Sequence, residues 1–203
     1  MTVLKLTKTF IASFALAAAA TPALADGERL FFEISNDISP DQPSAVVTLW
    51  AGFDARDWAL AGVAGSVVAS EGNWFALELV PPLNGPGTTP GVRTGGGSTV
   101  EGIIAGQLNF PSDILADPSN PIAFWRAEIE VFDFTPRTID LATDTSRFDV
   151  YIDRDSASSR SALADLQEAM GTVVVVPAPA SVALFAAAAG LSGLCRPRRR
   201  CVP

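Results

Sequence analysis

Short hydrophobic or alternating runs, separated by glycine, proline, asparagine and aspartate, recur along the middle of the chain from Asp26 to Val176. Runs of this length and spacing predict the β-strands of a sandwich or barrel. Nine strands are expected, over 30–35, 45–53, 63–70, 74–79, 99–108, 122–132, 138–141, 148–152 and 172–176. Since that number suits two packed sheets, the predicted fold class is an all-β, two-sheet β-sandwich.

The run from Ile122 to Phe132 shows the alternation most clearly. One parity carries a predicted buried face of Trp125, Ala127, Ile129 and Val131, and the other carries Phe124, Arg126, Glu128 and Glu130. Residues 81–98, rich in proline, glycine and threonine, predict a flexible crossover between the sheets. Residues 156–169 predict one short surface helix, because Leu163, Leu166 and Met170 have helical spacing.

The N-terminus has the three parts of a signal peptide. Lys5 and Lys8 form a positive region, an apolar run covers Phe10 to Ala20, and Ala23-Leu24-Ala25 supplies the small residues that signal peptidase requires. We therefore expect residues 1–25 to be removed by signal peptidase, with cleavage between Ala25 and Asp26.

A second apolar segment, from Ala180 to Cys195, lies near the C-terminus. Its length is close to the roughly 17–25 residues of a membrane-spanning helix. The arginines that follow it, at 196, 198, 199 and 200, favour a cytoplasmic tail under the positive-inside rule. The pattern predicts a transmembrane helix in the inner membrane, with residues 26–176 exported as one domain.

The order of these C-terminal parts resembles the PEP-CTERM sorting signal. Val176-Pro177-Ala178-Pro179 precedes the apolar helix, and the cluster Arg196, Arg198, Arg199 and Arg200 follows it. The resemblance covers residues 177–203 and implies recognition by an exosortase, a membrane transpeptidase-like enzyme that processes near the Pro-x-Pro motif. It also implies export in a Gram-negative-type bacterium that makes extracellular polysaccharide, to the cell surface or extracellular matrix. Ala178 stands where the motif has glutamate, and Pro197 interrupts the arginine tail.

The charge is segregated along the chain. All 22 acidic residues lie between Asp26 and Glu168, where only 8 of the 14 basic residues are found, so this part has a net charge of −14. Such a surface repels phosphate backbones, and no nucleic-acid partner is expected. The chain has no histidine, which excludes Ser-His-Asp and Cys-His catalysis and histidine-ligated zinc. Both cysteines, Cys195 and Cys201, lie in the tail, so the exported domain is expected to have no disulfide.

Two sets of residues are candidates for ligand binding. Asp149, Asp153 and Asp155 cluster in sequence around a strand end. The run from Asp153 to Ser156 begins like a calcium loop, but Ser158 and Ala164 stand where an EF-hand needs glycine and glutamate. A looser calcium site and a solvated acidic turn both remain open, and no other cofactor is expected. Among the tryptophans, Trp50 and Trp125 are predicted in the core. Trp58 and Trp74 adjoin turn residues, so either exposure for stacking on sugars or packing under a loop is expected.

The strand endings at 49–54, 148–153 and 171–176 are similar to those of cohesin-like and related carbohydrate-binding sandwiches, including jelly rolls. The function expected is that of a non-enzymatic surface or extracellular-matrix protein, structural or adhesive in extracellular polysaccharide or biofilm. The alternative is a carbohydrate-binding module. A third class is a carboxylate-based glycoside hydrolase, which would draw on Glu128, Glu130 and Asp133 in a cleft.

Overall fold

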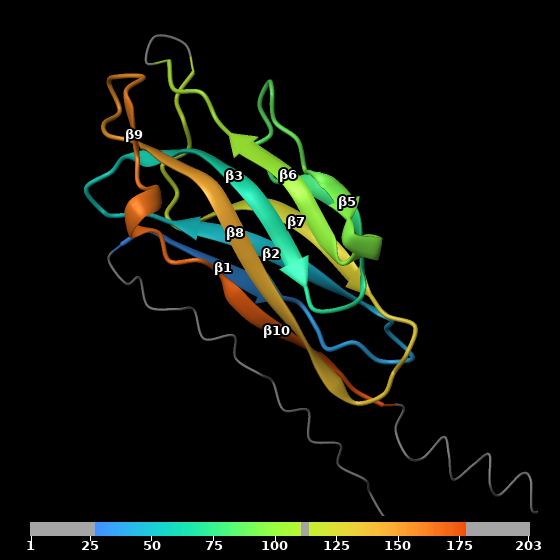
Figure 1. The fold of residues 1–203 in the computed structure, drawn as a ribbon. Coiled ribbons are helices and arrows are strands. Elements are labelled where there is room, and N and C mark those ends of the chain that lie inside the picture. Colours follow the sequence, from blue (N-terminus) through green and yellow to red (C-terminus); the bar gives the residue numbers. More distant parts are fainter. Residues whose placement is uncertain (1–26, 111–113, 178–203) are drawn as a thin grey trace, which may run out of the picture.

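The computed structural model describes residues 27–110 and 114–177, which form two β-sheets packed face to face (Figure 1). The smaller sheet has the order β1 (Arg29–Ile34), β2 (Ser44–Gly52), β7 (Ile122–Glu130), β4 (Asn73–Leu79). The larger sheet has the order β10 (Met170–Val175), β8 (Arg137–Tyr151), β3 (Ala59–Ala69), β6 (Thr99–Gly106), β5 (Val92–Thr94), and β9 (Ser159–Ser161) pairs with β8. The prediction of an all-β, two-sheet sandwich is confirmed.

Alternation of apolar residues places the core between the two sheets. The largest fully buried side chains are Trp74, Trp125, Phe124 and Phe148. On β7 the predicted parity is right for Trp125, Ala127, Ile129 and Val131, all of which are buried. It is wrong for Phe124, because a bulge opposite Leu49 and Trp50 inserts this residue into β7 and turns its ring inward as well.

Two of the strands predicted as separate are parts of a single long strand. Residues 138–141 and 148–152 both fall in β8, which continues from Arg137 to Tyr151. Its middle contains no large apolar residue, yet Thr143, Asp144 and Thr145 pair with β3 from Val67 back to Gly65. The backbone ladder with β3 therefore carries the strand across a stretch that the hydrophobic pattern leaves unmarked.

The predicted surface helix at 156–169 is wrong. This segment forms β9 and a 3₁₀ turn, η2 (Leu163–Asp165). Leu163 and Leu166 pack against the core, whereas Met170 is exposed at the start of β10. The backbone amide of Gln167 donates to Glu28 O at 3.0 Å, so pairing with the chain before β1 replaces helical hydrogen bonds.

The segment 81–98 crosses from β4 in the smaller sheet to β6 in the larger one, which confirms the predicted crossover, while its flexibility stays a prediction. It contains β5 and a 3₁₀ turn, η1 (Gly95–Gly97). Two buried indoles hold it: Trp125 Nε1 donates to Pro90 O at 3.0 Å, and Trp74 Nε1 donates to Ser98 O at 2.9 Å.

The last strand is tied to the loop between β1 and β2. Ile38, which is fully buried, donates its amide to Val174 O at 2.8 Å. Val176 in turn donates its amide to Ile38 O at 2.8 Å. These bonds close one side of the sandwich and fix the point at which the chain leaves it. Within 27–110 and 114–177, no helix is long and apolar enough to cross a membrane.

Candidate functional site

Only the first two residues of the predicted sorting signal, Val176 and Pro177, belong to the part of the chain that the structure describes. β10 ends at Val175, and Val176 and Pro177 follow it directly. Ala178, Pro179, Arg196, Arg198, Arg199 and Arg200 lie outside the described residues, as do the signal-cleavage residues Ala23, Ala25 and Asp26. The predicted motif therefore begins with no spacer after the final strand.

Trp58 and Trp74, for which either exposure or packing under a loop was expected, lie in different environments. Trp74 is 0% exposed, because it lies opposite the buried Ile129 of β7 and points between the sheets. Its assignment as a glycan contact is wrong. Trp58 is half-buried and packs against a small cluster that contains Ala59 and Tyr151.

Trp50 was predicted to lie in the core, but the structure places it outside the core. It lies between the buried Leu49 and Ala51 on β2, so its side chain points to the outer face of the smaller sheet rather than into the core. There it is half-buried and lies nearly parallel to Phe31 of β1, with an interplanar angle of 7° and ring centroids 6.3 Å apart. Sequence reasoning missed the outward direction of Trp50, although the alternation along β2 contained the signal.

The three aspartates of the predicted calcium site are not gathered. Asp149, on β8, accepts a hydrogen bond from Arg147 Nε. Asp153 Oδ1 accepts a hydrogen bond from the Asp155 amide at 3.0 Å within the turn that follows. Across the part of the chain that the structure describes, no three acidic, cysteine or histidine side chains are placed to hold a metal ion. Asp153 and Asp155 are exposed in this turn, whereas Asp149 is half-buried on β8.

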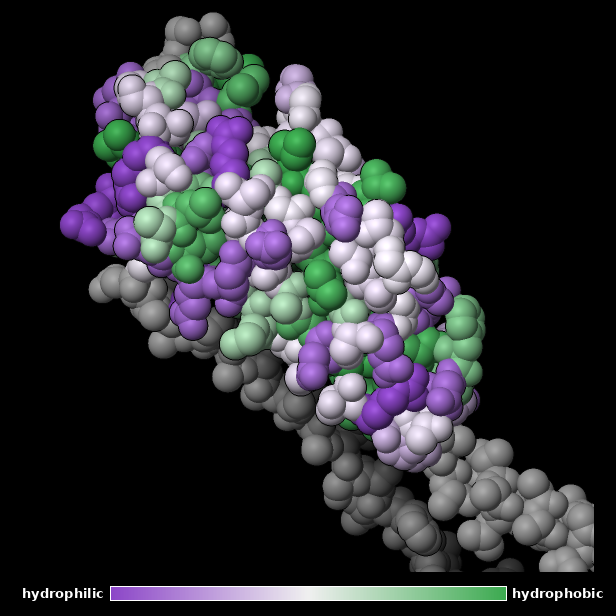
Figure 2. Space-filling model, in the orientation of Figure 1, coloured by the Kyte–Doolittle hydropathy of each residue, from purple (hydrophilic) through white to green (hydrophobic). Residues whose placement is uncertain are grey.

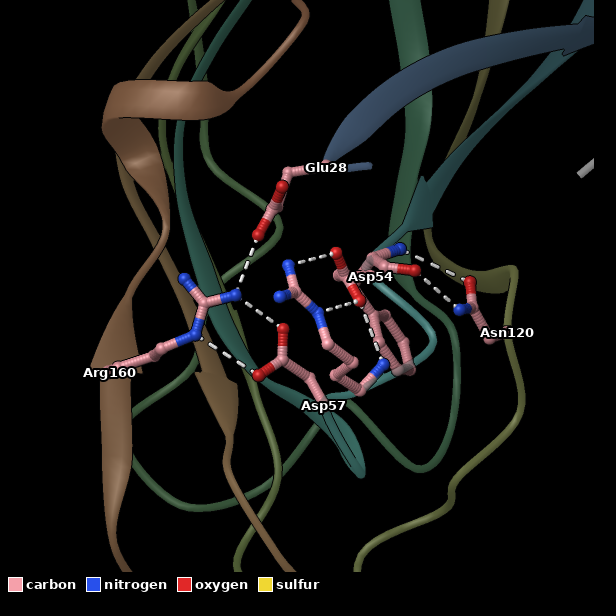
Figure 3. Close-up of polar contacts among 7 residues, drawn as sticks. Glu28, Asp54, Asp57, Asn120 and Arg160 are labelled. Atoms are coloured by element: carbon pink, nitrogen blue, oxygen red, sulfur yellow. Dashed lines mark hydrogen bonds and ion pairs between the residues drawn. The ribbon is translucent and has the colours of Figure 1, made fainter. Parts of the chain in front are cut away.

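Carboxylates and guanidinium groups do converge at one end of the sandwich (Figure 3). Arg160 of β9 donates from Nη2 to Glu28 Oε1 at 2.8 Å and from Nε to Asp57 Oδ1 at 3.1 Å. The Glu28 and Asp57 side chains are 8% and 5% exposed, against 37% for Arg160. Beside them Arg56 and Asp54 pair at 2.8 Å. This cluster ties β9, the chain before β1 and the β2–β3 turn together.

Each carboxylate in this cluster is paired with a guanidinium group. Hydrogen bonds to Asp57 and Glu28 raise the pKa of Arg160 above its ordinary value. Hydrogen bonds from the Arg56 side chain and backbone lower the pKa of Asp54. A glycoside hydrolase needs one carboxyl group free to donate a proton beside a second carboxylate. Here the guanidinium of Arg160 bridges the two buried carboxylates, an arrangement that favours a structural role.

Of the three carboxylates considered for hydrolysis, Glu128 and Glu130 lie half-buried on the outer face of β7, and Asp133 is exposed in the turn that follows it. Glu128 accepts a hydrogen bond from Ser44 Oγ at 3.0 Å. A hollow of about 500 Å³ lies elsewhere, beside β5, and is lined by Asn73, Val92, Arg93, Thr94 and the three glycines of η1. That hollow contains no carboxylate.

The outer face of the larger sheet is the one seen in Figure 2. Small and weakly polar side chains cover its middle, with separate hydrophobic spots between them. The exposed large apolar residues on the strands of this sheet are Val68, Val92, Ile104, Met170 and Val174. The two outer faces of the sandwich therefore differ, since the smaller sheet presents an aromatic pair among charged residues.

Comparison with known proteins shows the fold. No protein-family model and no curated protein matches the sequence. Among solved structures, the seventh type I cohesin of a scaffoldin from Pseudobacteroides cellulosolvens is similar with a TM-score of 0.52 and 12% identity, covering 76% of this chain and 96% of that one. The described domain thus has a cohesin-like sandwich.

Two further cohesins resemble the chain more weakly. The sixth cohesin of scaffoldin B from Acetivibrio cellulolyticus, in complex with a dockerin, has a TM-score of 0.43 and 9% identity over 71% of this chain and 95% of that one. A cohesin from a cohesin–dockerin complex of Clostridium thermocellum has a TM-score of 0.43 and 10% identity over 70% of this chain and 96% of that one.

Proposed function

We propose that this chain is a non-enzymatic surface protein, exported by a Gram-negative-type bacterium and sorted to the cell surface or extracellular matrix, where it has a structural or adhesive role. Signal peptidase removes residues 1–25, the C-terminal helix holds the precursor in the inner membrane, and an exosortase-like enzyme processes it near Pro177 and Pro179. The mature domain then acts within extracellular polysaccharide or biofilm.

The position of β10 is the observation that carries this proposal. The strand ends at Val175, and the amide of Val176 is still bonded to the sandwich through Ile38. Cleavage or membrane insertion just beyond Pro177 therefore leaves the folded domain whole. A domain attached by its last strand presents both outer sheet faces to its surroundings. The cohesin-like fold supports a binding role, and the bridging of Glu28 and Asp57 by Arg160 supports a non-enzymatic one.

The sorting part of the proposal is tested by changing the motif in the native host. Replacing Pro177 and Pro179 together with alanine is expected to leave an unprocessed precursor in the membrane fraction. Pro136→Ala, in an exposed turn between β7 and β8, is the matched control and is expected to leave processing unchanged. An immunoblot of membrane and extracellular fractions reads out both variants. Normal release of the double variant would contradict exosortase processing at this motif.

The adhesive part is tested by deleting the gene and measuring the cohesion of the polysaccharide matrix. We expect a weaker matrix that the wild-type gene restores. A matrix of unchanged strength, or release of reducing sugars by the purified protein, would contradict a non-enzymatic structural role.

A carbohydrate-binding module is the second candidate function. The specific observation that favours it is the outward-facing pair of Phe31 and Trp50, since a flat aromatic surface suits the apolar face of a sugar ring.

A further inference from the structure

The outer face of the smaller sheet carries an ordered arrangement of aromatic and hydrogen-bonding side chains. Strand register aligns Phe31, Trp50 and Ala123 in one row across β1, β2 and β7. The neighbouring row aligns Glu33, Thr48, Arg126 and Glu78 across all four strands. With strands spaced about 4.8 Å apart, this second row is about 14 Å long.

The aromatic row is held in a fixed geometry. Trp50 Nε1 donates to Glu33 Oε2 at 2.8 Å, which sets the orientation of the indole. Phe31 lies nearly parallel to the indole, and the Arg29 guanidinium carbon is 5.6 Å from the centroid of the Phe31 ring. On the other side of Trp50 the row continues with Ala123, which is half-buried and whose side chain is a single methyl group. A ligand with a flat apolar face therefore meets a ring that is already ordered.

The second row supplies the polar contacts that such a ligand needs. Glu33 and Glu78 are acceptors, Arg126 is a donor, and Thr48 is both. The Arg126 and Glu78 side chains are exposed, and their closest ionic contact is 3.8 Å, so both remain open to new hydrogen bonds. A sugar ring has this dual chemistry, because its C–H groups form an apolar face and its hydroxyl groups form a polar rim.

The charge of the domain restricts the class of sugar. The chain between Asp26 and Glu168 carries a net charge of −14, which repels polyanions. We propose that the outer face of the smaller sheet, centred on Trp50 and Phe31, is a binding site for a neutral polysaccharide. This inference rests on the proposed function, because it names the class of partner that the exported domain meets in the matrix.

The experiment uses the full chain purified in a detergent without a sugar headgroup. Binding is measured on an array of neutral glycans, including cellulose, chitin, dextran and galactomannan oligomers, with alginate as the anionic comparison. The wild-type chain is expected to bind at least one neutral glycan and not alginate. Trp50→Ala is expected to weaken that binding by about tenfold or more, the usual loss at a central aromatic contact.

Two further variants keep the test decisive. Phe132→Ala removes an aromatic side chain that is 77% exposed elsewhere on the surface, and it is expected to leave binding unchanged. Ala123→Gln places a longer side chain beside Trp50 in the row without removing any packing. It is expected to reduce binding even if Trp50→Ala fails to fold, as judged by circular dichroism.

The outcomes separate this site from the proposed function. Absence of binding to every neutral glycan, or binding to alginate alone, overturns the site while leaving the sorting and matrix tests standing. Binding that survives both Trp50→Ala and Ala123→Gln also overturns it, because the glycan would then be held elsewhere on the domain.

Discussion

Two aromatic pairs lie on opposite faces of the same sheet. Trp74 and Trp125 point inward, at an interplanar angle of 70° with ring centroids 5.6 Å apart. Phe31 and Trp50 point outward and lie nearly parallel. Both inner indoles donate to backbone carbonyls of the crossover segment, whereas the outer indole donates to the carboxylate of Glu33.

The difference shows that tryptophan has two roles in this sheet, one in the core and one on the outer surface. The inner pair fills the core and fastens the segment that joins the two sheets, so its loss should affect folding. The outer pair lies on the outer face of the smaller sheet, so its loss should affect what that face contacts. Stability and binding therefore divide between the two faces, and variants on each face test that division.

The largest expected effect is at Trp125. Trp125→Ala removes a fully buried indole and leaves Pro90 O without its donor. We expect a loss of about 3–5 kcal/mol in the free energy of unfolding, as for other large aromatic deletions in cores. Urea titration followed by far-ultraviolet circular dichroism measures it. A loss below about 1 kcal/mol would show that the core is not organised around this ring.

A smaller loss is expected at the charged end of the sandwich. Arg160→Ala leaves two buried carboxylates without their shared partner, at a cost of about 1–3 kcal/mol, within the range for unpaired buried groups. Arg56→Ala is the matched control, since the Arg56 side chain is exposed and its pair with Asp54 should contribute less to stability. Equal urea midpoints for the two variants would contradict the structural role of Arg160.

Trp50→Ala sharpens the contrast between the faces. A cross-strand aromatic pair on an exposed face contributes about 0.2–1 kcal/mol, so the urea midpoint should shift only slightly. The same variant is expected to lose glycan binding. A loss of stability as large as that of Trp125→Ala would place Trp50 among the residues that hold the fold.

The pH dependence of the Asp54–Arg56 pair is a weaker effect. The pKa of Asp54 is lowered in the folded protein from its ordinary value of 3.8, chiefly by the Arg56 side chain. Its stabilisation is therefore fully present above that value and is lost as the pH falls through the lowered folded pKa. Melting temperatures of wild type and Asp54→Asn should differ at neutral pH and converge in acid. A difference that is constant with pH would rule out this contribution.

Reduction is expected to have no effect. Because the only two cysteines lie at 195 and 201, the cohesin-like domain should melt at the same temperature with and without dithiothreitol. A clear drop on reduction would mean that the tail cysteines contribute to the folded domain.

The sequence predicted the strands where one face is apolar and the other polar. That pattern located β1, β2, β4, β6, β7 and β10 to within a few residues, because burial of one face is what produces it. It failed in the middle of β8, where Thr143, Asp144 and Thr145 are held by pairing with β3 rather than by burial. It also failed for the expected helix, where leucines at helical spacing pack onto the core from a turn.

The binding surface was harder to predict than the fold. Proximity to turn residues left both exposure and packing under a loop open for Trp74, and its place in the register of β4 and β7 buries it. The pairs Phe31–Trp50 and Arg126–Glu78 depend on which strands are neighbours and in what register. Neighbours and register are properties of the folded sheet, and a single sequence does not contain them as a local pattern.

The central claim is that a cohesin-like domain is exported, processed at both ends and displayed outside the cell. The intact mass of the native protein from membrane and extracellular fractions tests it most directly. A species that begins at Asp26 and ends between Pro177 and Pro179 is the predicted result. A species that begins at Asp26 and still contains Arg200 would contradict exosortase processing and leave a single-span anchored protein.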